Sequence, residues 1–303
     1  MDEFVSHVDV VDAHQHFWDL SANRYPWLQD APIAFRYGDY SPLRRNYLPA
    51  DYRRDTSGCG IVHTVHVEAE WDRATPHAET QWLQRLAAAE GLPTVVVAHA
   101  RLDAPDAAEV LSAHAACPMV RGIRHKPAAA ESHADARRGA AGSMDDPAWR
   151  RGYASLAEFD FSFDLQTPWW HLDAAVDLAR DFPDTTIVIN HTALPADRSA
   201  EGLAAWRRAL TAVADCPNVA LKISGLGQRD AAWTPQSNVP VVRAAIAIFG
   251  PRRCMFASNY PVDSLVAPFG AILAAFRAAI ADRTLAEQAM LLSRNALRIY
   301  RLD

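Results

Sequence analysis

Short, almost wholly apolar runs alternate along the chain with longer segments in which apolar residues recur every three or four positions. Runs rich in Val and Ile predict parallel strands buried on both faces, and the longer segments predict amphipathic helices. The predicted strands are 8–13, 61–68, 94–98, 120–125, 161–166, 186–190, 219–223 and 254–257. The predicted helices are 76–90, 105–116, 147–158, 171–181, 200–214, 239–249, 268–281 and 285–300.

This alternation favours an α/β fold, a distorted (β/α)8 TIM barrel, which accommodates all 303 residues as one domain, 1–303. The helix 285–300 is additional to the eight units, and we expect it to pack outside the barrel. After the first strand, segment 19–60 is predicted to be a long irregular loop, rich in Pro and aromatic residues. Such a loop is either a packing insert or a wall of a substrate pocket.

Composition narrows the class of protein. The formal net charge of −6 argues against nucleic acid and acidic membranes as partners, and a small-molecule substrate is expected instead. The four scattered cysteines form no CxxC pair, which favours a reducing compartment. Residues 1–4 lack the basic and apolar pattern of a signal peptide, so the expected location is cytoplasmic. Barrels of this size often form homodimers, although no apolar stripe identifies an interface.

Polar side chains suited to catalysis collect at the carboxyl ends of the predicted strands, where barrel enzymes hold their active sites. His14 and His16 end the first strand, and their spacing sends both imidazoles to one side of an extended chain. The other strand ends carry His66 and Glu68; His99; Arg124, His125 and Lys126; Asp164 and Gln166; Asn190 and His191; Lys222 and Ser224; and Ser258 and Asn259, with Asp263 four residues on. Polar residues that merely mark where strands leave the core do not explain every end, so the pattern predicts a catalytic site.

These residue types suggest roles. Neutral imidazoles suit Zn²⁺ or another divalent metal, Arg124 offers a planar fork to a carboxylate or an oxyanion, and Asp263 is a candidate general base. The candidate catalytic residues are His14, His16, Arg124, His191, Asn259 and Asp263, of which His14, His16 and His191 are also the candidate metal ligands. The candidate substrate-binding residues are Trp18, His66, Glu68, His125, Gln166 and Lys222, with an ion-paired structural role as the alternative for Lys222.

Six motifs occur in a family-specific order: DAHQHFW at 12–18, HVEA at 66–69, GIRH at 122–125, NHTALP at 190–195, KISGL at 222–226 and FASNYP at 256–261. The set resembles the amidohydrolase superfamily, and within it the amidohydrolase-2 branch that contains L-fuconolactonases, L-rhamnonolactonases and the pyrone-dicarboxylate and sulfomuconolactone lactonases. The resemblance covers nearly the whole chain. It implies a distorted barrel that hydrolyses the ester of a lactone ring.

The resemblance leaves the cofactor open. Many members hold one or two metals with the first-strand HxH pair, a later His and an Asp that ends strand eight, whereas some lactonases polarise the carbonyl with Arg and His alone. It implies a polarising and substrate-binding set of His14, His16, Arg124, His125 and His191. This chain departs from the family at Asn259, where the usual Ser-Asp-x-Pro has an amide that is neither a general base nor a strong metal ligand. Asp263, His191, His16 and Glu68 are the alternative proton acceptors.

The leading hypothesis is therefore a hydrolase that opens a small, polar or anionic lactone by attack of water on a carbonyl polarised by a metal or by Arg and His. A non-oxidative decarboxylase or hydratase of the same superfamily is the first alternative. A catalytically retired barrel used for binding is the second; the Asn259 change supports it, and the cost of retaining so many buried polar groups opposes it.

Overall fold

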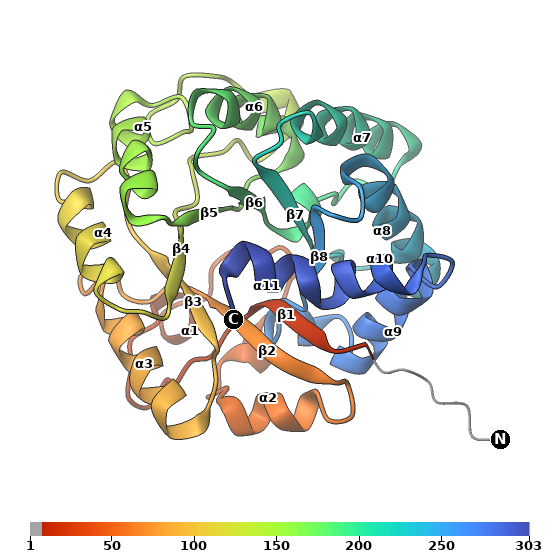
Figure 1. Cartoon of the computed structure of the whole chain (residues 1–303), viewed down its shortest axis with the longest axis horizontal. Helices are drawn as coiled ribbons and strands as arrows, with labels where there is room; N and C mark the ends of the chain where they lie inside the picture. Colours follow the sequence, from red (N-terminus) through yellow and green to blue (C-terminus); the bar gives the residue numbers. More distant parts are fainter. Residues whose placement is uncertain (1–7, 303) are drawn as a thin grey trace.

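The computed structural model describes residues 8–302, which form a barrel of parallel strands surrounded by helices (Figure 1). Within these residues, eight strands pair in sequence order, so the predicted (β/α)8 fold is confirmed. The strands are β1 (Val10–Gln15), β2 (Ile61–Val67), β3 (Val95–His99), β4 (Val120–Arg124), β5 (Ser162–Leu165), β6 (Ile187–Ile189), β7 (Val219–Ile223) and β8 (Cys254–Phe256). Residues 1–4, on which the cytoplasmic expectation rests, and the extreme ends of the predicted domain 1–303 lie outside the described residues.

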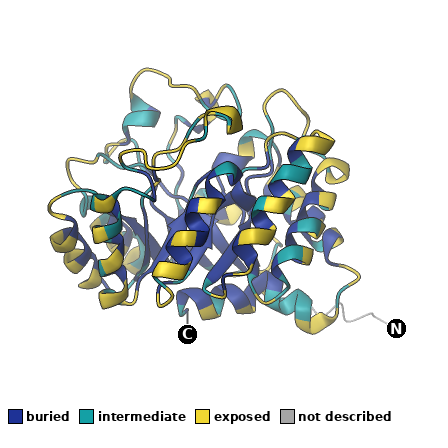
Figure 2. Ribbon diagram, turned by 90° about the horizontal axis from the view of Figure 1, so that it is seen from above, coloured by how far each residue is buried: buried dark blue, intermediate teal, exposed yellow. Residues whose placement is uncertain are grey.

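A helix that follows each of the strands β2 to β8 covers the outside of the barrel, and the inner faces of these helices are buried (Figure 2). They are α3 (Ala78–Glu90), α4 (Ala107–Ala115), α5 (Pro147–Ala154), α6 (Leu172–Asp181), α7 (Ala200–Ala214), α8 (Pro235–Phe249) and α9 (Phe269–Ala279). Short turns of 3-10 helix lie at Ser41–Leu43, His133–Asp135, Ser155–Phe159, Trp169–His171, His191–Ala193 and Val262–Leu265. No helix between residues 8 and 302 combines the length and apolar character needed to cross a membrane.

Segment 19–60 is more regular than the sequence suggested. It contains α1 (Pro26–Gln29) and α2 (Pro49–Asp55), each of which begins with proline at its first helical position. Proline fits there because that position needs no backbone N–H donor. The prediction of a wholly irregular loop was therefore wrong. The prolines were interpreted as loop residues, although two of them begin short helices.

The first and last strands meet through polar groups rather than through a continuous ladder. A single bridge joins Gln15 to Tyr260, and the backbone N–H of Asn259 donates to the carbonyl of His14 at 2.7 Å. Beside them, the Asp12 carboxylate accepts from the backbone N–H of Ser258 at 2.8 Å and from its hydroxyl at 2.6 Å. This seam places the histidines that end β1 next to Asn259.

The C-terminal segment closes the end of the barrel opposite the strand carboxyl ends, where it crosses the centre of the view in Figure 1. It consists of α10 (Leu285–Ala289), a π-helical turn (Met290–Arg294) and α11 (Asn295–Tyr300). Ala296, Ile299 and Tyr300 pack in one buried cluster with Val11 and other inward-facing strand residues. The expectation of a helix packed outside was wrong in this respect, because α11 fills the barrel floor.

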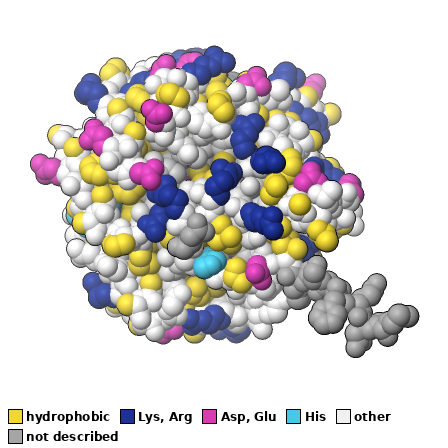
Figure 3. Space-filling model, viewed as in Figure 1, with side chains coloured by type: hydrophobic (Ala, Val, Ile, Leu, Met, Phe, Trp, Pro, Cys, Tyr) yellow, Lys and Arg dark blue, Asp and Glu magenta, His cyan; other side chains and the backbone are white. Residues whose placement is uncertain are grey.

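Arginine and lysine side chains gather around this closed face (Figure 3). Several of them donate to backbone carbonyls across the joint between α11 and the barrel. Arg298 donates to the carbonyl of Arg252 at 2.9 Å, and Arg301 donates to that of Asp160 at 2.7 Å. These arginines therefore tie the C-terminal helix to the loops that begin β8 and β5.

We expect Tyr300→Phe to lower the free energy of unfolding by about 1–3 kcal/mol. The Tyr300 hydroxyl donates to Asp164 at 2.9 Å inside the barrel, and both side chains are fully buried, so the substitution leaves a carboxylate oxygen short of a donor. Tyr153→Phe is the matched control, because the hydroxyl of Tyr153 is buried without a partner among the described residues. Urea denaturation measures both variants, and equal stabilities would contradict the role of Tyr300.

Candidate active site

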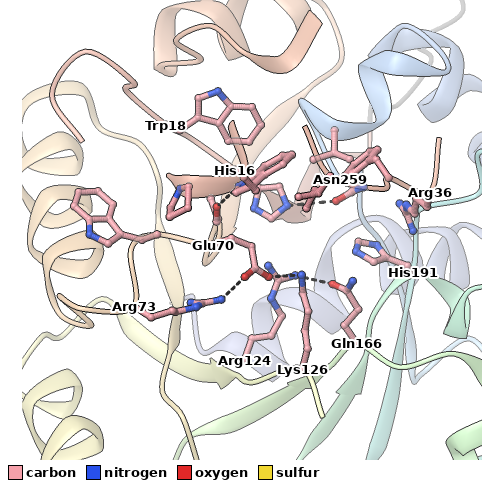
Figure 4. A pocket seen from close by; sticks show the side chains of 17 residues that line it. His16, Trp18, Arg36, Glu70, Arg73, Arg124, Lys126, Gln166, His191 and Asn259 are labelled. Atoms are coloured by element: carbon pink, nitrogen blue, oxygen red, sulfur yellow. Dashed lines mark hydrogen bonds and ion pairs between the residues drawn. The ribbon is translucent and has the colours of Figure 1, made fainter. Parts of the chain in front are cut away.

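A cavity of about 530 Å³ lies among the loops that follow the strands (Figure 4). Six of the sequence-predicted site residues line it: His16, Trp18, Arg124, Gln166, His191 and Asn259. The other six lie behind this lining: His14, His66, Glu68, His125, Lys222 and Asp263. All six are less than one-fifth exposed, so their influence on the cavity passes through the residues that line it.

The hydrogen bonds of His16 fix which of its nitrogens carries the proton. Nδ1 lies 2.7 Å from the carbonyl oxygen of Val67, which only accepts, so Nδ1 carries the hydrogen. Burial, with Arg124 nearby, holds the pKa of His16 well below its usual value and keeps the ring neutral. Nε2 is therefore an unprotonated acceptor, and it points toward Asn259.

Asn259 presents a second acceptor beside the first. Its Nδ2 lies 2.6 Å from Asp263 Oδ1, and because a carboxylate only accepts, the amide nitrogen must face Asp263. The amide oxygen consequently faces His16 Nε2 at 3.3 Å. Two lone pairs thus meet at the cavity wall, an arrangement that favours a water or a cation beside them.

Asp263 is buried behind Asn259. Its Oδ1 also accepts from the Tyr37 hydroxyl at 3.0 Å and lies 3.4 Å from the Arg36 guanidinium. Burial raises the pKa of Asp263, while Arg36 and the hydrogen bonds from Asn259 and Tyr37 favour its ionised form. The turn after Pro261 does bring Asp263 inward, but only as far as the back of the amide.

His191 stands on a backbone turn that is uncommon for residues with side chains. Residues 191–194 all have positive φ angles, between 52° and 57°, and none is glycine. Such left-handed residues each cost about 1–2 kcal/mol, so the surrounding structure must hold the turn. The Trp206 indole donates to the carbonyl of Thr192 at 2.9 Å, and His191 Nδ1 lies 3.0 Å from the Ser224 hydroxyl. The turn thereby places His191 in the cavity lining.

His14 lies beneath His16 and His191, with ring centroids 5.0 and 4.6 Å away. Both of its ring nitrogens are buried without a hydrogen-bond partner in the described part of the chain. Burial and the nearby Lys222 hold the pKa of His14 well below its usual value, so the ring is neutral. Three neutral imidazoles are a donor set that suits zinc. Within residues 8–302, however, no three His, Cys, Asp or Glu side chains already converge on one metal position.

Arg124 is held by two neighbours and keeps part of its donor capacity. Its Nε donates to Glu68 Oε1 at 2.7 Å, one NH2 hydrogen goes to the Glu68 carbonyl, and NH1 donates to Gln166 at 3.1 Å. A guanidinium has five N–H groups, so two remain for a ligand. Burial raises the pKa of Glu68, but the charges of Arg124 and Arg73 outweigh it and hold that pKa well below its usual value, so the carboxylate is ionised.

Several lining residues were missed by sequence reasoning because they lie on loops. Arg36, Glu70 and Arg73 contribute charge to the cavity, together with Lys126, which the sequence had placed at the end of the fourth strand. Glu70 forms ion pairs with both Arg73 and Lys126 (Figure 4). The φ angle of Glu70 is 60°, which is rare for glutamate. The sequence contains no signal for such backbone strain, so it could not be predicted.

Aromatic side chains form another part of the wall of this cavity. Trp18, Trp27, Phe35 and Trp71 line the cavity, and the rings of Trp27 and Phe35 stack with centroids 5.9 Å apart. Other aromatic residues of segment 19–60, such as Tyr47 and Tyr52, are buried in the core, so the structure supports both interpretations of the segment, the packing insert and the pocket wall.

The remaining predicted residues have partners that explain their positions. His66 accepts from the backbone N–H of Phe17 at 3.1 Å, and His125 accepts from that of Leu102 at 3.1 Å. Lys222 is fully buried and ion-paired with Asp164, and burial lowers its pKa to about 8. This geometry matches the structural alternative for Lys222.

A barrel with its polar cluster at the strand carboxyl ends defines a class of enzyme fold, and sequence comparison identifies the family. A family model described as amidohydrolase matches residues 11–302. The chain belongs to the amidohydrolase family, as its motifs indicated, and it is an enzyme.

Three relatives cover nearly the whole chain. The protein y4mH of Sinorhizobium fredii is 38% identical over 304 residues, covering 98% of this chain and 100% of its own. An L-fucono-1,5-lactonase of Burkholderia multivorans is 30% identical, covering 96% of each chain. A crystal structure of an amidohydrolase from Burkholderia multivorans with bound zinc is 28% identical, covers 97% of this chain and 100% of its own, and superposes with a TM-score of 0.79.

Proposed function

We propose that this enzyme opens the ring of a small, neutral, hydroxyl-bearing lactone by adding water to its carbonyl. The observation that carries the proposal is the pair of acceptors, His16 Nε2 and Asn259 Oδ1, in the same cavity as the spare donors of Arg124. Hydrolysis of an ester needs both kinds of group, because water must lose a proton while the carbonyl oxygen gains negative charge.

The acceptor pair suits the attacking water. A water beside His16 Nε2 and Asn259 Oδ1 donates one hydrogen to each and turns its lone pairs away from them, toward the cavity. His16 then takes a proton as the water oxygen bonds to the carbonyl carbon, and it returns that proton to the ring oxygen when the ester bond breaks. Atoms and charges balance, with a hydroxy acid as the product.

Arg124 suits the carbonyl. Its two spare N–H groups are the donors that would stabilise the tetrahedral oxyanion, and its contacts with Glu68 and Gln166 hold the guanidinium in place before substrate binds. No reorganisation of the guanidinium is then needed as the charge develops.

The cations around the cavity are nearly balanced by carboxylates, so a neutral substrate is compatible with the site as well as the anionic one that Arg124 suggested. Arg124 is paired with Glu68, Arg73 and Lys126 with Glu70, and Arg36 with Asp263. These four cations and three carboxylates leave a single net positive charge, and the paired groups still offer hydrogen bonds to hydroxyls. The tryptophan-rich wall offers an apolar surface to the C–H face of a sugar-like ring. The lactonase names of the Burkholderia relatives agree with this substrate class.

A divalent metal is an alternative use of the same residues, because His16 Nε2 cannot bind a metal and accept the proton of water at the same time. The donor chemistry of His14, with two orphaned buried nitrogens, fits a nitrogen-liganded ion, and we propose that His14, His16 and His191 would hold it. Such an ion supplies Lewis-acid polarisation of the carbonyl.

A substrate panel tests the proposal. The purified chain is assayed by proton release with neutral sugar 1,4- and 1,5-lactones, with carboxylated lactones and, for CO₂ release, with hydroxybenzoic acids, while its metal content is measured. We expect the neutral lactones to show the highest kcat/KM. Turnover confined to carboxylated lactones would overturn the substrate class, and CO₂ release without lactone opening would overturn the reaction.

A further inference from the structure

We infer that Asp263 is a positioning residue, whose task is to hold the Asn259 carboxamide with its oxygen toward His16. The inference rests on the proposed hydrolysis and adds a role for a side chain that touches neither the cavity nor the substrate. It also accounts for the amide at a position where the family usually has a carboxylate.

The orientation of the Asn259 amide decides which group it presents to His16. A free carboxamide can exchange its oxygen and nitrogen by rotation about its last bond, which would aim N–H donors at His16 Nε2 instead of an acceptor. Asp263 prevents that rotation, because its carboxylate lies 2.6 Å from Asn259 Nδ2 and accepts only. The flipped amide would place its oxygen against the carboxylate, with two acceptors in contact.

Asp263 is itself held from other segments of the chain. The Tyr37 hydroxyl donates to it at 3.0 Å, Arg36 lies 3.4 Å away, and its backbone N–H donates to the carbonyl of Asn259 at 3.0 Å. Its side chain is 2% exposed. A carboxylate with this many donors has little freedom to move, so it can fix the amide.

The backbone of Asn259 adds a second constraint. Its φ angle is 57°, in the left-handed region that asparagine tolerates better than most residues, and its N–H is bonded to β1. The amide and the carboxylate together therefore form a unit in which Asn259 touches the reacting water and Asp263 sets its direction.

Four variants of the full chain test this unit by steady-state kinetics on the best neutral lactone. For Asp263→Ala we expect kcat to fall roughly 10–100-fold with KM nearly unchanged, as a displaced water-orienting group requires. The variant Asp263→Asn retains one acceptor for Asn259, so its kcat should fall less than that of Asp263→Ala.

The variant Asn259→Asp places two carboxyl groups in contact. These groups share a proton, so the rate of this variant should depend steeply on pH. The exchanged pair, Asn259→Asp with Asp263→Asn, restores one amide beside one carboxylate and should exceed the activity predicted by multiplying the two single effects.

Thermal unfolding of each variant, and NMR of the Asn259 side-chain amide, separate positioning from folding and from activity. In the wild-type chain we expect a downfield amide proton that Asp263→Ala removes while the fold remains intact. If Asp263→Ala keeps wild-type kcat, or if the exchanged pair shows purely multiplicative effects, the inference is wrong. If no lactone is opened, the proposed function fails, and the NMR signal alone decides whether Asp263 orients the amide.

Discussion

Replacing Arg124 with Ala is expected to lower the free energy of unfolding by about 3–5 kcal/mol and kcat by roughly 10²–10³-fold. The loss of stability follows because Glu68, which is 1% exposed, would keep only the half-exposed Arg73 as a counter-charge. The loss of rate follows because Arg124 lines the cavity and its spare N–H groups disappear. Urea denaturation and lactone kinetics measure the two effects.

A double variant separates stability from catalysis. Arg124→Ala combined with Glu68→Gln removes both charges, so the unfolding free energy should recover while kcat stays low. Arg121→Ala is the control on the same strand, because this half-buried arginine donates only to backbone carbonyls on the far side of the barrel. If Arg124→Ala and Arg121→Ala had the same kinetics, Arg124 would have no part in the reaction.

Gly225→Ala is expected to be nearly as damaging. Gly225 has a φ angle of 63°, and an added Cβ would lie 2.7 Å from the Cβ of His191 and 2.9 Å from Arg36 NH2. The methyl group therefore displaces His191 from the left-handed turn that holds it, and a shift of about 1 Å in such a group costs roughly 10²-fold in rate. We expect that loss in kcat/KM, measured by lactone hydrolysis.

Gly91→Ala supplies the matched control. Gly91 also lies in the left-handed region, with a φ angle of 72°, but nothing lies within 4 Å of the position of its added Cβ. Both substitutions carry the backbone cost of about 1–2 kcal/mol for a left-handed alanine, and only Gly225→Ala also carries the collision. Equal activities in the two variants would refute the link between Gly225 and His191.

The sequence predicted the barrel well because buried parallel strands leave apolar runs that need no knowledge of distant residues. The strand ends then located His16, Arg124, Gln166 and His191, since parallel strands deliver their carboxyl ends to one place. Asn259 was recognised through its motif. These parts of the site follow from local pattern and topology.

The rest of the site depends on contacts that no local pattern encodes. Arg36, Glu70 and Arg73 reach the cavity from loops, whose paths are set by packing with distant segments. Asp263 was expected as a general base because it is the carboxylate that follows Asn259 most closely in the sequence, which does not show that the amide separates it from the cavity. The burial of the C-terminal helix could have been predicted from the sequence. Its apolar residues Ala296, Ile299 and Tyr300 lie on one face, and such a face is stable only when it packs against another apolar surface.

The closure of the barrel floor by α11 also affects how the chain folds while it is being synthesised. The centre of the enzyme joins residues that are far apart in the chain, because Ser258 donates to Asp12 and Tyr300 donates to Asp164. During synthesis the first strands leave the ribosome long before α11 has been made. The inward-facing residues of these strands therefore lack the helix against which they pack in the finished protein. We expect nascent chains that stop before Tyr300 to hold the early βα units in a loose, protease-sensitive state that becomes compact only when the last helix arrives.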